Sequence, residues 1–173
     1  MQRCLVLGSG GAGKTTFSLA LGQITGIPVV HLDGHFWQPG WRALAPEDWE
    51  ARVRALAERP SWIMDGNYGG TLDVRLAFAD AVVFLDTPRL QCITGVLRRR
   101  WAWRGRSRPS LPDGCRERIT PRFLHWIWTY PTLRRPALLT RLGELGPETA
   151  VHVLRGRREQ DRFLAAARQG LLR

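Results

Sequence analysis

Residues 8–16 decide the fold class, and they read Gly8-Ser9-Gly10-Gly11-Ala12-Gly13-Lys14-Thr15-Thr16. They match G-x-x-x-x-G-K-[ST], a pattern in which the backbone N–H groups of a glycine-rich loop point at phosphate oxygens. An apolar run precedes the loop and a helical pattern follows it, as such a loop requires, and the helix N-terminus adds partial positive charge. We therefore expect residues 8–16 to bind nucleotide phosphates, with the Lys14 ammonium on the β- and γ-phosphates and the Thr15 hydroxyl on Mg²⁺.

Lysine at position 14 is unusual because arginine supplies every other basic side chain. Of the 26 lysine and arginine residues in the chain, only Lys14 is a lysine. A compact ammonium on a flexible stem acts as a point charge, whereas a guanidinium fork is bulkier. Since there is no second lysine, the chain lacks the N-K-x-D motif with which Ras-type GTPases bind guanine. We therefore do not expect a GTPase of that type.

Composition indicates a globular protein of one domain. The chain has 173 residues, of which 44% are hydrophobic and 24% charged, so we expect a single domain over residues 1–173. No run approaches the ~20 apolar residues of a membrane span, and the first apolar run is too short for a signal peptide. The three cysteines show no C-x-x-C spacing and predict neither disulfides nor zinc. We expect a cytoplasmic protein with no membrane partner, and its oligomeric state is left open.

Short apolar runs bounded by Gly, Pro or Asp predict strands that are buried on both faces of a parallel sheet. Amphipathic stretches between them predict helices, which follow residue 14, span Pro46–Glu58, open at Thr87-Pro88 and Thr120-Pro121, and cover the tail from Glu159. This alternation predicts a three-layer α/β/α domain with right-handed crossovers. The predicted strands are Arg3–Leu7, Pro28–Leu32, Trp62–Asp65, Ala81–Leu85 and Ala150–Leu154.

Two segments fit the sheet pattern poorly, and we expect both to leave the core and cover a site. The first is His35–Arg59, within an excursion of about residues 34–60. The second is Arg98–Arg118, which is polar, rich in arginine and interrupted by proline and glycine. A flexible basic segment of this kind is typical of a lid that closes over a nucleotide and excludes water.

Acidic residues follow three of the predicted strands, at the sheet edge where open α/β sheets bind ligands. One carboxylate is needed to hold the water shell of Mg²⁺, and a second can orient the group that accepts a phosphoryl. Asp33 and Asp65 are the candidates for these two roles. Asp65 opens the segment DGNYGG, in which Asn67 and Tyr68 place polar groups beside glycines. The simplest interpretation of Asp86 is a residue at the start of a helix.

The segment HLDGHFWQPGW has two further interpretations. His31, Asp33 and His35 alternate, but a lone H-x-D-x-H lacks the ligands of a closed zinc site. Trp37 and Trp41 can stack on a base or sugar, or they can pack the excursion on the core.

Six arginines gather in the run RRRWAWRGRSRP, with no acid among them. Guanidinium groups bind phosphate with two hydrogen bonds and neutralise charge on a transferring phosphoryl group. The formal net charge of +11 likewise indicates anionic partners, although an arginine-rich codon usage would give the same total. A solvated basic face and a nucleic-acid site, with Trp101 and Trp103 stacking on bases, are the alternatives.

With these residues identified, the chain resembles the P-loop nucleoside and nucleotide kinases, and is similar to adenylate kinase and shikimate kinase. It resembles most closely the small bacterial adenylate-kinase-related proteins called DNA topology modulation proteins. The segments that carry this resemblance are HLDGHFWQPGW, DGNYGGTLDVRL, FLDTP, RGRSRP and GCRERI.

The resemblance implies a sheet of five parallel strands in the order 2-3-1-4-5, with an arginine-rich lid over about residues 98–118. It implies that Asp33 holds the acceptor or a metal-bound water, and that Asp65 corresponds to the acidic residue opening the D-G segment of adenylate kinases. It places Arg104 and Arg108 in the lid and Arg75 at a position for acceptor binding. DGNYGG replaces the D-G-F-P-R of adenylate kinases.

These observations predict an enzyme that uses ATP and Mg²⁺ to phosphorylate a small acceptor, such as a nucleotide, nucleoside or other hydroxylated metabolite. The alternative is a P-loop ATPase that binds nucleic acid and affects DNA topology. A nucleotide-binding regulator without turnover is a third possibility.

Overall fold

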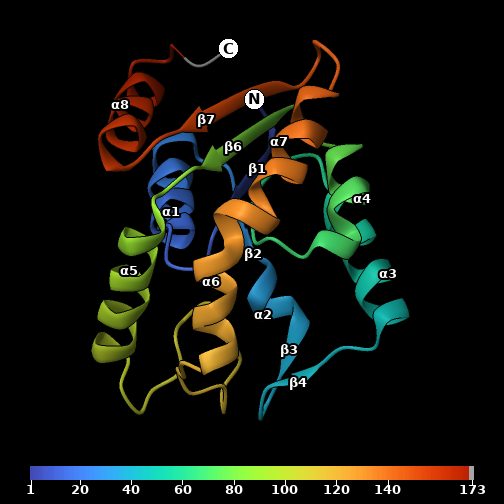
Figure 1. Cartoon of the computed structure of the whole chain (residues 1–173). Helices are drawn as coiled ribbons and strands as arrows, with labels where there is room; N and C mark the ends of the chain where they lie inside the picture. Colours follow the sequence, from blue (N-terminus) through green and yellow to red (C-terminus); the bar gives the residue numbers. More distant parts are fainter. Residues whose placement is uncertain (172–173) are drawn as a thin grey trace.

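The computed structural model describes residues 1–171 and has a five-stranded parallel sheet at its centre (Figure 1). The strand order is β2-β5-β1-β6-β7, which is the expected 2-3-1-4-5 of the core strands. Three strands have the predicted bounds, and the other two differ by one or two residues. The strands are β1 (Arg3–Gly8), β2 (Val29–His31), β5 (Trp62–Asp65), β6 (Ala81–Leu85) and β7 (Ala150–Leu154).

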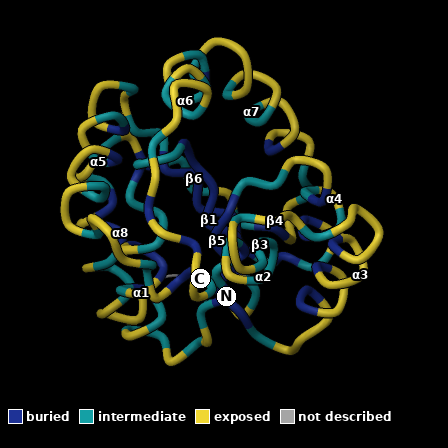
Figure 2. The backbone as a smooth tube through the Cα atoms, turned by 90° about the horizontal axis from the view of Figure 1, so that it is seen from below, coloured by how far each residue is buried: buried dark blue, intermediate teal, exposed yellow. Residues whose placement is uncertain are grey.

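Helices cover both faces of the sheet because the strands are apolar on both sides. One face carries α1 (Lys14–Thr25), α5 (Arg89–Ala102) and α8 (Arg157–Arg168). The other carries α3 (Pro46–Ala57), α4 (Leu72–Leu76) and α7 (Arg135–Gly143). Helix α6 (Pro121–Leu133) packs into both layers, since Ile127 lies in the core cluster of the first face and Tyr130 in that of the second. Strands β1, β5 and β6 are almost wholly buried and lie near the centre of Figure 2, and much of the exposed yellow tube belongs to the surrounding helices. The three-layer α/β/α prediction is confirmed.

The first excursion is less separate from the core than expected. It contains α2 (Leu32–Phe36), a small antiparallel sheet of β3 (Trp37–Gln38) and β4 (Arg42–Ala43), and then α3. Trp49, Val53 and Leu56 of α3 are buried against the central sheet. These three residues share one helix face, so the pattern that identified the helix also explains why it joins the core.

The second excursion also begins later than expected, because α5 continues through the arginine run to Ala102. The segment left between α5 and α6 is residues 103–120, which we call the lid after its expected role. An isolated antiparallel bridge in it joins Ser107 and Arg116. The lid ends at the predicted helix start: the Thr120 hydroxyl accepts a hydrogen bond from the N–H of Phe123 at 3.2 Å and caps α6. Thr87 is no such cap, since α5 begins at Arg89 after Pro88.

No helix in residues 1–171 is long and apolar enough to cross a membrane.

Candidate active site

The glycine-rich loop joins β1 to α1, and Lys14 is the first residue of that helix. Its ammonium folds back over the loop, where Nζ donates to the carbonyl oxygens of Gly8 at 2.8 Å and Ser9 at 3.0 Å. Burial lowers the pKa of Lys14, and the carboxylates of Asp65 and Asp33 oppose that shift. The first N–H groups of α1, including those of Thr15 and Thr16, have no carbonyl partner within the helix. The loop therefore offers N–H donors beside a cation.

Close packing against α5 and α6 sets the path of this loop. Gly11 has φ +79°, and a Cβ on it would overlap the backbone carbonyl of Cys92 in α5. A Cβ on Gly10 would lie 2.6 Å from the Phe123 ring in α6. Ala12, in the same turn, is buried. Glycine is needed here for close approach as well as for backbone conformation.

We predict that Gly11→Ala destabilises the protein more than Gly26→Ala. Gly26 also has a positive φ of 73°, but a Cβ there meets nothing within 4 Å. Gly26→Ala loses only the stability that a left-handed backbone costs a residue with a Cβ, about 1–2 kcal/mol. Gly11→Ala adds a steric overlap that costs about 1–3 kcal/mol. Urea unfolding of both variants measures the difference. Equal losses would mean that the loop does not pack against α5 as described.

Asp65 ends β5 beside the loop and is 5% exposed. Its Oδ1 is 3.1 Å from His31 Nδ1 at the end of the neighbouring β2. This hydrogen bond, opposed by burial, raises the pKa of His31. Among the described residues, Asp65 Oδ2 and Ser9 Oγ are buried without a hydrogen-bond partner. Unpartnered buried oxygens fit a site that a ligand or hydrated metal completes.

Asp33 lies in the first turn of α2, directly after β2 and at the same end of the sheet as Asp65. Its Oδ1 accepts a hydrogen bond of 2.7 Å from the Tyr68 hydroxyl, and its Oδ2 is 3.6 Å from Arg108 Nη2 in the lid. Burial and the Asp33 carboxylate raise the pKa of Tyr68, so its hydroxyl remains a donor. Asp33 is thus brought together with the lid, while its own side chain stays 43% exposed.

The DGNYGG segment is held in place by Arg75, which lies in α4 with no solvent exposure. Its guanidinium donates to the carbonyl oxygens of Gly66 at 2.9 Å and of Tyr68 at 2.8 Å, and also to those of Asn67 and Thr71. These bonds place Arg75 as a support of the DGNYGG segment, and its expected role in acceptor binding stays a prediction. Asn67 in turn links this segment to the phosphate loop, where its Oδ1 accepts from the N–H of Gly8 at 3.2 Å.

The lid arginines differ in their surroundings although they share one sequence run. The Arg108 side chain is largely buried, with 10% of its surface exposed, whereas Arg104 is exposed. Arg104 therefore does not lie with the groups described above, since its side chain faces solvent. Arg99, at the end of α5, does point inward: its Nε donates to Glu117 Oε1 at 2.8 Å, and it lowers the pKa of Lys14. Sequence reasoning did not single out Arg99 or Glu117, because no local pattern distinguishes them.

The aromatic residues of the first excursion pack on one another. The Trp37 ring lies 4.8 Å from Phe36 and 5.2 Å from Trp41, both edge to face. Trp41 Nε1 also donates to the Arg116 carbonyl of the lid. The structure shows Trp37 packed within the excursion and Trp41 packed against the lid, which differs from the packing on the core that the sequence suggested. Trp101, in contrast, is 81% exposed at the end of α5.

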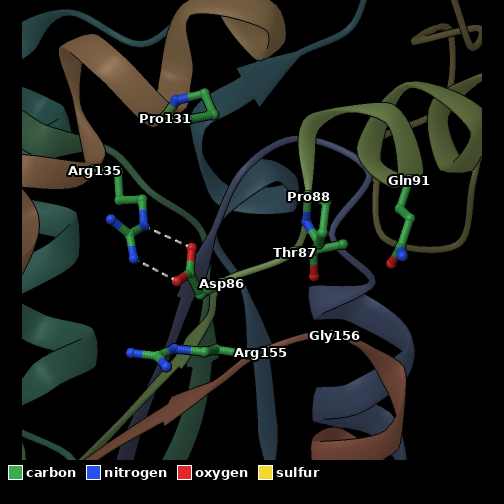
Figure 3. Close-up of a pocket in the computed structure, with 8 residues that line it drawn as sticks. All are labelled: Asp86, Thr87, Pro88, Gln91, Pro131, Arg135, Arg155 and Gly156. Atoms are coloured by element: carbon green, nitrogen blue, oxygen red, sulfur yellow. Dashed lines mark hydrogen bonds and ion pairs between the residues drawn. The ribbon is translucent and has the colours of Figure 1, made fainter.

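A pocket of about 480 Å³ opens at the ends of β6 and β7, next to the phosphate loop (Figure 3). Asp86 lines it and makes two hydrogen bonds of 2.8 and 2.7 Å with Arg135. Asp86 is therefore an ion-pair partner, not a residue that starts a helix. Thr87 connects the pocket to the loop, since its hydroxyl donates to the Ala12 carbonyl at 3.4 Å.

The described residues contain no cluster of three or more His, Cys, Asp or Glu side chains that could bind a metal. His31 and Asp33 contact different partners, Asp65 and Tyr68.

Known proteins resemble the chain in structure and not in sequence. No family model matches it, and no curated protein matches its sequence. Shikimate kinase from Acinetobacter baumannii, solved with shikimate, has a TM-score of 0.59 at 17% identity, over 99% of this chain and 93% of that one. The chain has the same fold as this kinase. A gluconokinase from Sinorhizobium meliloti 1021 has a TM-score of 0.56 at 19% identity, over 98% of this chain and 91% of that one.

In P-loop folds the phosphate loop after β1 faces the carboxyl ends of the neighbouring strands. Identities of 17–19% establish the fold alone. The chemistry must follow from the side chains at that edge, which are Lys14, His31, Asp33, Asp65, Arg99 and Arg108.

Proposed function

We propose that this protein transfers the γ-phosphoryl group of ATP to a hydroxyl group of a small molecule. One observation carries the proposal: Asp33 lies between the phosphate-loop edge of the sheet and an inward-pointing lid arginine, Arg108, 3.6 Å away. A carboxylate beside a cation at a phosphate site suits an acceptor hydroxyl and the phosphoryl that it attacks.

In the proposed reaction the acceptor oxygen bonds to the γ-phosphorus, the bond from phosphorus to the ADP oxygen breaks, and the hydroxyl proton passes to Asp33. Residues 8–16 hold the phosphates through backbone N–H groups, and Lys14 leaves the carbonyls of Gly8 and Ser9 to contact the β- and γ-phosphates. Arg108 neutralises charge on the phosphoryl group while it is transferred. No covalent enzyme intermediate is needed.

Mg²⁺ would be held by the Thr15 hydroxyl and, through water, by Asp65, where it would neutralise phosphate charge. The unpartnered Oδ2 of Asp65 suits this role. Asn67 and Tyr68 would shape the acceptor site from the loop that Arg75 holds, and Trp37 would border it. The pocket beside Thr87 would take the nucleoside part of ATP, because it adjoins the loop at Ala12.

Incubation of the protein with Mg²⁺ and γ-labelled ATP tests this proposal. The acceptor panel would hold nucleosides, nucleoside monophosphates and other small hydroxylated metabolites. Label on one small acceptor is the expected result and would name the substrate. ATP hydrolysis stimulated only by DNA or RNA, with no labelled acceptor, would contradict it.

That second outcome corresponds to the alternative function, a P-loop ATPase acting on nucleic acid. The exposed Trp101 beside exposed arginines of α5 and the lid is the observation that favours it. It would also agree with the proposed relationship to DNA topology modulation proteins. Binding that falls steeply with salt would support this function.

We predict that Arg108→Ala lowers the transfer rate by about 10²–10³-fold, because the group in transfer loses a preorganised cation. Arg98→Ala removes an exposed arginine from the same run and is expected to change the rate little. Initial rates at saturating ATP measure both effects. Equal losses for the two variants would show that overall basic charge, and not the position of Arg108, assists transfer.

A further inference from the structure

Glu117 is a buried carboxylate in the lid that nothing in the reaction above uses. Its side chain is 1% exposed. Oε1 accepts from Arg99 Nε at 2.8 Å, and Oε2 lies 2.7 Å from Arg108 Nε in an ion pair. A buried carboxylate between two arginines costs desolvation that these contacts must offset. The arrangement therefore joins the end of α5 to the lid through one acid.

Both arginines approach Glu117 through Nε, but only Arg99 Nε is hydrogen-bonded to it. Arg108 Nε and Glu117 Oε2 form an ion pair without hydrogen-bond geometry. A guanidinium group has five N–H donors in a rigid plane, and Nε carries only one of them. The Nη groups of Arg99 and Arg108 are not bonded to Glu117, and Arg108 Nη2 is directed at Asp33, 3.6 Å away. The terminal donors of the pair are therefore left for another anion.

The position of Arg99 shows where that anion would lie. Its guanidinium carbon is 6.0 Å from the centre of the Phe123 ring, and Phe123 in turn lies against Gly10 of the phosphate loop. Arg99 also lowers the pKa of Lys14, as a nearby cation does. Arg99 thus approaches the phosphate loop and Arg108 approaches Asp33, with Glu117 between them.

The lid backbone holds Glu117 in place from two sides. The Glu117 N–H donates to the Arg106 carbonyl at 3.1 Å, next to the Ser107–Arg116 bridge. The adjacent Arg116 carbonyl accepts from Trp41 Nε1 of the first excursion at 3.1 Å. The carboxylate is consequently fixed relative to both excursions when the lid has this position.

We propose that Glu117 is a positioning residue that aligns Arg99 and Arg108 as a pair to bind the terminal phosphate of ATP. This inference rests on the proposed function and adds a second arginine and the acid that orients it. With the carboxylate present, both guanidinium groups are directed toward the phosphate loop and Asp33. Without it, two like charges face each other unscreened and the pair separates.

Binding of Mg-ATP and Mg-ADP, measured by calorimetry on the full chain, tests the proposal without knowledge of the acceptor. Wild type is expected to prefer ATP because only ATP carries the phosphate that the pair binds. Glu117→Gln is expected to weaken ATP binding at least about tenfold and to change ADP binding less than about twofold. Glu117→Asp, which keeps the charge, should recover part of the preference for ATP.

Two results would overturn the proposal: an unchanged ATP-to-ADP ratio in Glu117→Gln, or an equal loss of both nucleotides, which would indicate a merely structural role. If Glu117→Gln fails to fold, Arg99→Ala replaces it and must lose the same preference for ATP. Retained preference in Arg99→Ala would equally overturn the proposal. A wild type that binds neither nucleotide would instead refute the proposed function itself.

Discussion

Replacing Lys14 with alanine is expected to lower phosphoryl transfer by about 10²–10³-fold or more. Nζ is the cation inside the phosphate loop, where it now contacts the carbonyls of Gly8 and Ser9. No other lysine exists in the chain, and the inward arginines reach the site from α5 and the lid instead. The substitution therefore removes the only lysine ammonium that can contact the β- and γ-phosphates during transfer.

Lys14→Ala is not expected to unfold the protein, since its two hydrogen bonds lie within the loop. Rates and urea unfolding of the same preparation separate the two effects. Lys14→Arg serves as the matched control, because it keeps the charge but replaces the ammonium by a wider fork, and it should also lose most activity. Full activity in Lys14→Ala would refute the kinase proposal.

Replacing Arg75 with methionine is expected to cause the largest loss of stability, on the order of 3 kcal/mol or more. Its guanidinium satisfies the carbonyls of Gly66, Asn67, Tyr68 and Thr71. A buried polar group left without a partner costs about 1–3 kcal/mol, and methionine can satisfy none of these. Burial also lowers the pKa of Arg75 to about 10, which reflects how completely it is removed from water.

The control for this substitution is Arg54→Met on the outer face of α3. Arg54 makes one exposed i,i+4 ion pair with Glu50, at 3.6 Å, which is worth about 0.3–0.5 kcal/mol. Urea unfolding curves of both variants give the comparison. Similar midpoints for the two variants would show that Arg75 does not hold the DGNYGG segment together.

Much of the fold follows from local patterns. Buried parallel strands must be apolar on both faces, so short runs such as Ala81–Leu85 are recognisable without knowledge of their neighbours. The phosphate loop is equally local, because its function depends on consecutive backbone N–H groups and one adjacent lysine. Trp49, Val53 and Leu56 identified α3, but not that it covers the sheet.

The site was predicted only in part because its contacts join residues far apart in the chain. Asp33 and Tyr68 were both candidates, yet their hydrogen bond spans 35 residues. Arg75 was expected to bind the acceptor, and in the structure it bonds four backbone carbonyls. No spacing rule distinguishes a guanidinium that faces a ligand from one that faces its own loop.

By itself, the sequence determined the strands, most helices, the phosphate loop and the acids at the sheet edge, because each depends on neighbouring residues. The tertiary structure decided which arginine faces inward. Arg104 and Arg108 occur in one run, but only Arg108 meets a buried carboxylate, Glu117, and a facing acid, Asp33. The direction of a long, flexible side chain is set by the charges that the folded chain brings to it, and those come from distant segments.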